Sequence, residues 1–228
     1  LTIVVSVAAI MLTWMLALPI GIYSAVRQYS FADHLFTFIG FIGIAIPNFL
    51  LALIIMYFSF KLLGANVGGL FSPEFERAAW SWAKVWDLMK HLPLPALILA
   101  LAGTAQLVRI MRANLLDELR RPYVVTARAK GLRERRVILK YPVRAALNPF
   151  ASTIGYLFPF VVSGSIIVSL VLSLPTVGPL LLRALLAQDI YLAGTIILLL
   201  GVLTVIGTFI SDLVLMWVDP RIRAGFSA

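Results

Sequence analysis

The chain has 228 residues, of which 61% are hydrophobic and only 13% are charged, and its mean hydropathy is +1.00. A typical soluble domain carries about 25% charged residues, so this composition excludes a protein that has water as its main solvent. The formal net charge is +9, and there is no cysteine, which excludes disulfide bonds and thiolate sites.

Five segments without Asp, Glu, Lys or Arg follow one another along the chain. They are residues 1–26, 35–60, 92–108, 145–182 and 190–211. A helix that crosses the ~30 Å hydrocarbon layer needs about 20 such residues, and the third segment reaches that length if Arg109 and Arg112 extend their charges to the membrane surface. The segments are apolar on all sides and do not alternate as in a membrane barrel. We therefore predict an all-α, polytopic membrane protein with five transmembrane helices.

The second predicted span contains a proline at its centre, Pro47, and the fourth contains Pro149, Pro159 and Pro175. Proline removes a backbone donor and bends a helix. Such bends suit a gate, and ordinary packing kinks explain them equally well.

Three tryptophans lie close together in the connection between the second and third predicted spans. They are Trp80, Trp82 and Trp86. Tryptophan is enriched at membrane–water interfaces, which favours an interfacial position for this insert. The alternative is that the insert receives a binding protein or stacks on a sugar-like substrate.

Positive charge is concentrated between the third and fourth predicted spans. Residues 109–144 contain eleven of the nineteen Lys and Arg residues and have a net charge of +8. Alternate connections face the same side, which places fourteen of the nineteen on one side and five on the other. Because Lys and Arg accumulate in cytoplasmic loops, we predict that this block and the C-terminus are cytoplasmic. No groove-reading motif accompanies it, so nucleic acid is not expected as a partner.

The residues of the basic block are arranged in a pattern that membrane topology alone does not require. Within TARAKGLRERRVILKYP, residues 126–142, Gly131 separates two stretches of helix-forming residues, and Pro122 suits the first turn of the first stretch. Glycine permits a bend, so we predict two short helices that meet at an angle. The small side chains of Ala127 and Ala129 let another surface approach closely. Basic donors surround them: Arg128, Lys130, Arg133, Arg135 and Arg136.

The last third of the chain has two further features. Residues 174–190 favour a short helix on the outer side, and Asp212 lies inside the fifth predicted span. A carboxylate at that depth faces protein or water, so Asp212 either lines a pathway or contacts another helix. The two histidines, His34 and His91, have no Cys or carboxylate companions at ligand spacing and predict no metal site.

The basic loop resembles the EAA loop of ABC importer permeases, whose pattern is Glu-Ala-Ala, three residues, then Gly. The aligned positions are Val125, Thr126, Ala127 and Gly131, of which the first two depart from the pattern and the last two match it. TARAKG is usual for this loop in the oligopeptide/dipeptide/nickel branch of binding-protein-dependent permeases. The segments LPIGIYSAVR, IAIPNFLLAL and DPRIR also resemble that branch.

The resemblance implies a type I importer permease in the plasma (inner) membrane of a prokaryote, with residues 1–228 as a single transmembrane domain and residues 117–146 as its cytoplasmic coupling loop. A further N-terminal helix and an extracytoplasmic segment are expected before residue 1. The implied partners are a second, homologous permease subunit in a heterodimer, two ATPase subunits, an extracytoplasmic substrate-binding protein and membrane lipid. The residues implied in ATPase coupling are Val125, Thr126, Ala127, Arg128, Ala129, Lys130, Gly131, Leu132, Arg133, Arg135 and Arg136.

The implied function is ATP-driven uptake of peptides or a related small solute, without chemistry on the substrate. Nickel complexes, opines and oligosaccharides, which the branch also handles, stay open. No cofactor is expected in this chain, because ATP and Mg²⁺ are implied to bind the partner subunits. The chain has no phosphate-binding loop pattern.

Two rival functions need groups that the spans hardly offer. An ion-coupled secondary transporter needs coupling carboxylates or histidines in its spans. An intramembrane protease needs a nucleophile with a base, or a pair of aspartates. Asp212, which directly follows the last uncharged segment in the fifth predicted span, is the one candidate for either role.

Overall fold

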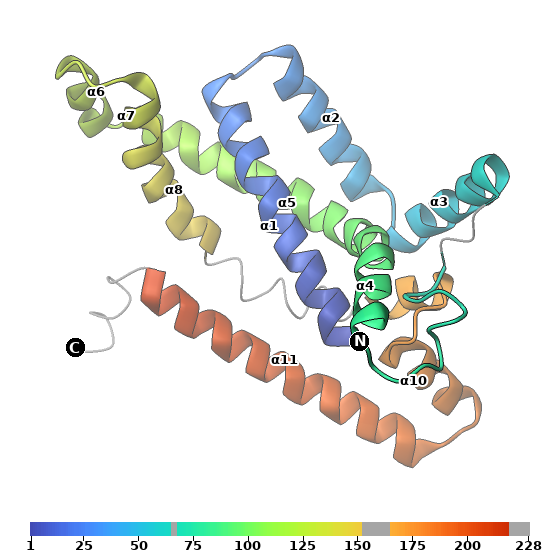
Figure 1. Ribbon diagram of the computed structural model, residues 1–228. Coiled ribbons are helices and arrows are strands. Elements are labelled where there is room, and N and C mark those ends of the chain that lie inside the picture. Colours follow the sequence, from blue (N-terminus) through green and yellow to red (C-terminus); the bar gives the residue numbers. More distant parts are fainter. Residues whose placement is uncertain (65–67, 152–164, 219–228) are drawn as a thin grey trace, which may run out of the picture.

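The computed structural model describes residues 1–64, 68–151 and 165–218, and all regular secondary structure in these residues is helical (Figure 1). The helices are α1 (Thr2–Val26), α2 (Phe31–Ala45), α3 (Asn48–Leu63), α4 (Trp82–His91), α5 (Pro93–Leu119), α6 (Pro122–Ala129), α7 (Glu134–Lys140), α8 (Pro142–Ala151), α10 (Val177–Leu186) and α11 (Ile190–Val218). Residues 165–171 are also helical. The predicted all-α fold is confirmed.

Three of the described helices, α1, α5 and α11, are each long and apolar enough to cross a membrane. The pair formed by α2 and α3 meets the same criterion only when both helices are taken together. The fourth predicted span, residues 145–182, has its middle outside the described residues. The count of five spans therefore stays a prediction.

The second predicted span is not one straight crossing. Its two helices are bent by 104° relative to each other. The chain is extended at Ile46, with φ −91° and ψ 121°, and again at Pro47. Proline lacks a backbone N–H and pushes the preceding residue out of the helical region, which explains why α2 ends at Ala45. In Figure 1, α2 lies along α5, and α3 turns away beyond the bend.

Helices α1 and α5 pack against each other and form the centre of the described bundle. At their close approach, a Cβ atom added to Gly21 would lie 2.7 Å from the Cβ of Met111, so a larger residue does not fit. Two buried apolar clusters line the pair, one near the start of both helices and one near their ends. The first includes Val5, Ala9, Ile98, Leu99 and Leu172, and the second includes Ala17, Leu107, Met111, Leu115 and Val143.

The last third of the chain returns to the start of α1. The backbone N–H of Val177, at the beginning of α10, donates to the Thr2 hydroxyl over 3.0 Å. Gly178 follows, and a Cβ added there would lie 2.4 Å from the Ser169 hydroxyl oxygen. The short helix predicted within residues 174–190 is confirmed as α10.

Helix α5 joins two opposite ends of the molecule. Its 27 residues extend over about 40 Å at ~1.5 Å per residue. Leu92 ends α4 immediately before it, and α6 begins at Pro122 soon after it. Figure 1 accordingly shows α4 near one end of α5, and α6 and α7 at the other.

Candidate coupling site

The basic block folds into two short helices, as the sequence predicts. We call residues 122–140, which comprise α6, the connecting turn and α7, the elbow. Pro122 occupies the first turn of α6, where its missing N–H costs no hydrogen bond. Gly131 forms the turn with φ +73°, a left-handed conformation that favours glycine. A Cβ added to Gly131 would meet nothing within 4 Å, so backbone conformation and not space requires glycine here.

The elbow has a small apolar core of its own. Val124, Ala127 and Val137 are buried, and Leu132 and Tyr141 pack against them. Ala127 thus points into the elbow, so its small size serves internal packing and not the approach of another surface that we expected. Ala129 is exposed, as that expectation requires.

An ion pair closes the corner between α6 and α7. The Arg128 guanidinium donates to the Glu134 carboxylate, with an Nη2–Oε1 distance of 2.6 Å and Nε–oxygen distances of 3.1 and 3.2 Å. The bonds from Arg128 hold the pKa of Glu134 below its ordinary value, although burial opposes the shift. Both side chains are exposed, so the pair contributes at most about 1 kcal/mol. Arg128 is therefore engaged within the elbow, where the sequence predicted a surface donor.

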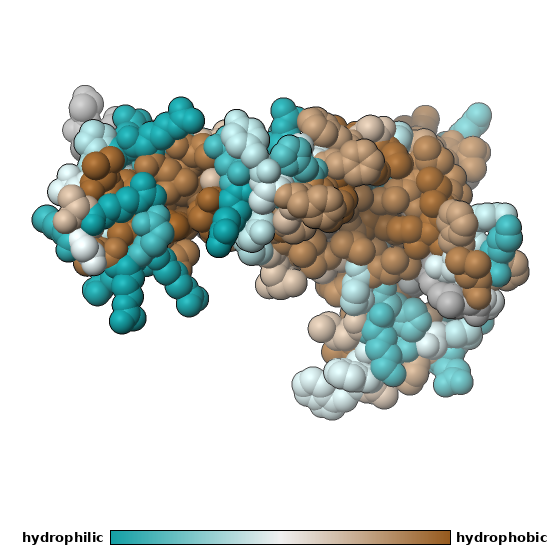
Figure 2. All heavy atoms as spheres, turned by 90° about the horizontal axis from the view of Figure 1, so that it is seen from above, coloured by the Kyte–Doolittle hydropathy of each residue, from teal (hydrophilic) through white to brown (hydrophobic). Residues whose placement is uncertain are grey.

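The remaining predicted residues form an open basic surface. A shallow depression of about 850 Å³ lies along α7 and the turn. Its lining residues are Gly131, Leu132, Arg133, Arg135, Arg136, Leu139 and Lys140. Val125, Thr126 and Lys130 are also exposed. Figure 2 shows hydrophilic side chains gathered at the end formed by α6 and α7, whereas hydrophobic residues cover most of the rest of that face. This surface suits a protein partner with acidic and apolar groups.

Both ends of the elbow are anchored in the bundle. At the α5 end, Tyr123 donates a hydrogen bond to Glu118; burial and that bond raise the pKa of Tyr123 to about 12. At the other end, α8 follows α7 and packs on α5 through Val143 and Ala146. A displacement of the elbow would therefore move α5 and α8 together.

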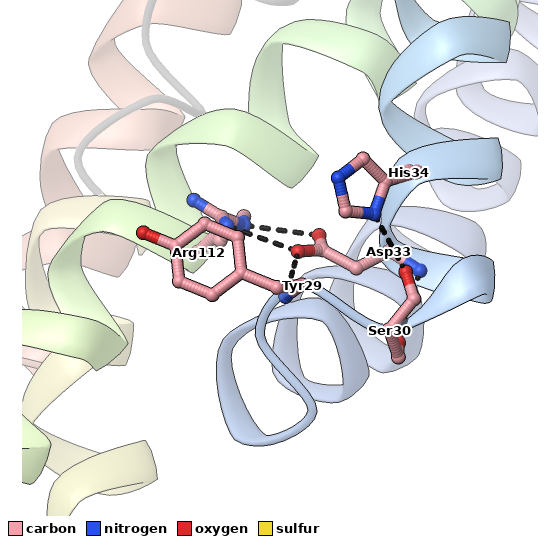
Figure 3. Close-up of polar contacts among 5 residues, drawn as sticks. All are labelled: Tyr29, Ser30, Asp33, His34 and Arg112. Atoms are coloured by element: carbon pink, nitrogen blue, oxygen red, sulfur yellow. Dashed lines mark hydrogen bonds and ion pairs between the residues drawn. The ribbon is translucent and has the colours of Figure 1, made fainter.

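A partly buried ion pair links α5 to the start of α2 (Figure 3). The Arg112 guanidinium donates to both carboxylate oxygens of Asp33, from Nε over 3.1 Å and from Nη2 over 3.0 Å. The backbone N–H of Tyr29 also donates to Asp33 over 2.9 Å, and Ser30 caps α2 by accepting from the Asp33 N–H. Asp33 is only 3% exposed. We call Asp33 and Arg112 the clasp.

Sequence reasoning missed the clasp. The expectation that Arg112 extends its charge to the membrane surface stays a prediction, and it did not include the carboxylate 79 residues away that Arg112 binds. The sequence does show Asp33 as a lone acidic residue between two uncharged segments. Residue spacing, however, does not predict a contact between residues so far apart.

Asp212 lies on α11 with an exposed side chain. Most of the apolar window of α11 is uncovered by the described chain, so the structure brings Asp212 together with none of the predicted coupling residues. Among the described residues, no group of three or more His, Cys, Asp or Glu side chains is placed to hold a metal ion.

The fold and this site define a helical membrane protein that presents a braced basic surface at one end. Residues 17–224 match a family described as the binding-protein-dependent transport system inner membrane component. The chain therefore belongs to that family of inner-membrane transport permeases, which confirms the resemblance to ABC importer permeases and gives no support to the ion-coupled alternative. It is a multi-pass, non-catalytic subunit.

Individual relatives agree over almost the whole chain. The oligopeptide transport system permease protein AppB of Bacillus subtilis (strain 168) is 37% identical over 225 residues, which cover 97% of this chain and 69% of that protein. A putative peptide permease protein of Brucella ovis is 35% identical over 223 residues, covering 97% and 68%. The oligopeptide transport system permease protein OppB of Escherichia coli (strain K12) is 30% identical over 217 residues, covering 95% and 66%.

Proposed function

We propose that this chain is the peptide-translocating permease of an ATP-driven importer, in which the elbow receives the motion of an ATPase subunit. The observation that carries the proposal is the elbow itself, two short helices with their own core, an exposed basic surface and anchors to α5 and α8. The names of the relatives above support peptides as the substrate class.

The elbow residues divide into two roles in this proposal. Ala127, Arg128 and Gly131 set the shape of the corner, because they are buried, ion-paired or in a left-handed conformation. Leu132 supports the core, half-buried beside it. The exposed residues contact the ATPase: Val125, Thr126, Ala129, Lys130, Arg133, Arg135 and Arg136. ATP and Mg²⁺ bind the ATPase and not this chain.

The clasp extends the moving unit beyond the elbow. Packed elements transmit displacement as rigid bodies, and Arg112 lies on the same helix that leads into α6. When α5 moves, the Arg112 guanidinium therefore carries the start of α2 with it. In this way a force applied at the elbow reaches the bend between α2 and α3.

The topology that follows places the elbow, the coupling loop of residues 117–146 and the C-terminus on the cytoplasmic side. A different, homologous permease subunit completes the pathway and covers the exposed apolar surface of α11. Asp212 then faces that subunit or the pathway, because a carboxylate within a span requires protein or water around it.

Cysteine cross-linking in the assembled transporter tests the contact. The chain has no cysteine of its own, so Arg135→Cys and Val125→Cys place single reactive groups on the elbow surface. We expect cross-links to the ATPase subunit from both positions and none from Glu74→Cys, which lies in the connection at the other end of α5. Absence of any elbow cross-link to the ATPase would overturn the proposal.

Substitution of Gly131 tests the shape of the corner. Gly131→Val places a β-branched residue at φ +73°, a conformation that such residues avoid, and we expect ATP-driven uptake of trialanine to be lost while membrane insertion persists. Gly131→Asn is the matched control, because asparagine tolerates left-handed conformations, and it should retain uptake. Full uptake by the valine variant would contradict the assigned role.

A further inference from the structure

Helix α4 buries two charged residues and exposes apolar ones, which is the reverse of a helix on the surface of a water-soluble protein. Its charged residues Lys84 and Asp87 are each only 6% exposed, whereas Trp82 is 90%, Trp86 66% and Met89 57% exposed. Charged residues are almost never fully buried unless they have partners, so Lys84 and Asp87 require partners on the inner side of α4.

Lys84 is held inside by the connection that precedes α4. Its ammonium group donates to the Ala78 carbonyl over 2.7 Å and to the Glu76 carbonyl over 3.4 Å. It also lies 4.8 Å from the ring centre of Phe71 and 5.4 Å from that of Trp80, distances at which a cation is attracted to an aromatic face. Lys84 is thus satisfied without reaching water.

Asp87 fixes the other part of the same connection. The backbone N–H and the hydroxyl of Ser72 each donate to its carboxylate over 2.7 Å. Burial alone would raise the pKa of Asp87, but these bonds and the neighbouring His91 and Lys90 together hold it below its ordinary value. Residues 68–81 are therefore fastened to the inner side of α4.

The outer side of α4 forms a continuous apolar stripe. It consists of Trp82, Val85, Trp86 and Met89, which follow the i, i+3, i+4, i+7 spacing of one helix face. The exposed charges of the preceding connection, Glu74, Glu76 and Arg77, lie outside this stripe in sequence, and Lys90 borders it.

The position of the stripe identifies what covers it. Leu92 caps both the end of α4 and the start of α5, and α5 is long and apolar enough to cross a membrane, so α4 adjoins the end of a candidate span. Tryptophan is enriched at that level of a membrane. Lysine beside an apolar face is typical of helices that lie in the interfacial plane.

We propose that α4 is an interfacial helix that rests on the lipid leaflet opposite the elbow, with Trp82, Trp86 and Met89 in the boundary between headgroups and acyl chains. This anchoring fixes residues 68–81 relative to the bilayer. Their Gly69 N–H donates to the Leu172 carbonyl over 2.7 Å, so the support extends to the segment before α10. The inference does not depend on the proposed coupling function.

Nitroxide labelling tests the position of α4 directly. The full chain, assembled with cysteine-free partner subunits in phosphatidylcholine–phosphatidylglycerol bilayers, carries a label at Trp86→Cys or Met89→Cys. Oxygen partitions into lipid and a nickel chelate into water, so we expect both labels to be several-fold more accessible to oxygen than to the chelate. Glu74→Cys is the water-exposed control and should give the reverse order.

Three results would overturn the proposal. Access by the chelate equal to that at position 74 would place α4 in water. Loss of access to both reagents would place it against another subunit. Chelate access that disappears when the substrate-binding protein is added would assign the stripe to that protein. None of these readouts requires transport, so failure of the coupling experiments leaves this test intact.

A second measurement uses the native tryptophans and leaves α4 unchanged. In the full chain with Trp14→Phe and Trp217→Phe, the fluorescence comes from Trp80, Trp82 and Trp86. Lipids brominated near the ester end of the acyl chain should quench most of this emission, and lipids brominated near the terminal methyl should quench much less. Equal, weak quenching by both lipids would contradict an interfacial position.

Discussion

The two ends of α5 direct their charged and apolar side chains in opposite ways. At the elbow, aliphatic side chains point inward and Arg and Lys point outward. At α4, Lys84 and Asp87 point inward and tryptophans point outward. Because a side chain is directed toward the medium that solvates it, the comparison indicates water or a polar partner around the elbow and lipid around α4. The direction of side chains, more than their composition, distinguishes a docking surface from a membrane-resting one.

The clasp is the exception at the elbow end, because it buries charge there, and its removal has the largest expected effect. Asp33→Ala leaves the Arg112 guanidinium without its carboxylate, which costs less than the ~3–5 kcal/mol of a fully buried pair, because the Arg112 side chain is 28% exposed. We expect a marked drop in thermal stability in detergent and loss of uptake. The double variant Asp33→Ala/Arg112→Met removes both charges and should recover much of the stability but not the coupling. Equal stability of the single variant and the unchanged protein would show that the pair is not buried in the assembled transporter.

A carboxylate introduced on the buried or the exposed face of α6 tests which of its side chains point into the elbow core. Ala127→Glu introduces a carboxylate into the elbow core, which should cost about 3 kcal/mol or more of local stability and increase protease cleavage within residues 122–140. Ala129→Glu adds the same group to an exposed position and should leave cleavage unchanged. Similar cleavage of both variants would contradict the inward direction of Ala127.

Acid should loosen the contacts between α4 and the connection that precedes it. The pKa of Asp87 is lowered from its ordinary value of 3.8, so its bonds stabilise the fold above that pH and are lost as the pH falls through the lower folded value. Tryptophan fluorescence of residues 80–86 should therefore show an acid transition. Asp87→Asn should be unable to titrate and should lack that transition, whereas a transition that persists in this variant would assign it to another group.

The smallest expected effect concerns the exposed ion pair of the elbow. Arg128→Ala removes the bonds to Glu134, and at an exposed site this costs at most about 1 kcal/mol. Because the pair sets the corner angle, we expect a modest fall in uptake per ATP hydrolysed. Arg144→Ala, which removes one exposed charge outside the elbow that has no ion pair among the described residues, is the matched control for charge alone. A fall of equal size in both variants would mean that net charge and not the corner angle matters.

The sequence predicts those features that depend on neighbouring residues. Pro122 and Gly131 mark the two helices of the elbow, because proline and glycine act on the local backbone. The inward position of Ala127 could also have been predicted, because Val124 lies three residues before it on the same helix face. The bend at Pro47 was expected as a kink, but its angle depends on how α2 and α3 pack.

Features that depend on distant contacts were not predictable from spacing. The clasp joins two residues that only the packing of α2 on α5 brings together. Lys84 and Asp87 have the composition of an exposed helix face, and their burial follows from the fold of residues 68–81 around them. Composition predicts an interfacial position for Trp82 and Trp86, but it could not show that Lys84 and Asp87 on the same helix are buried.

The hydrogen bond from Val177 to Thr2 constrains how the chain is made. Its two partners are 175 residues apart, so a ribosome delivers the acceptor long before the donor exists. Helix α1 is therefore made before its partner α10, and no nascent polypeptide that stops short of α10 can form this contact. Assembly of this part of the permease is thus completed late, only after α10 has been made.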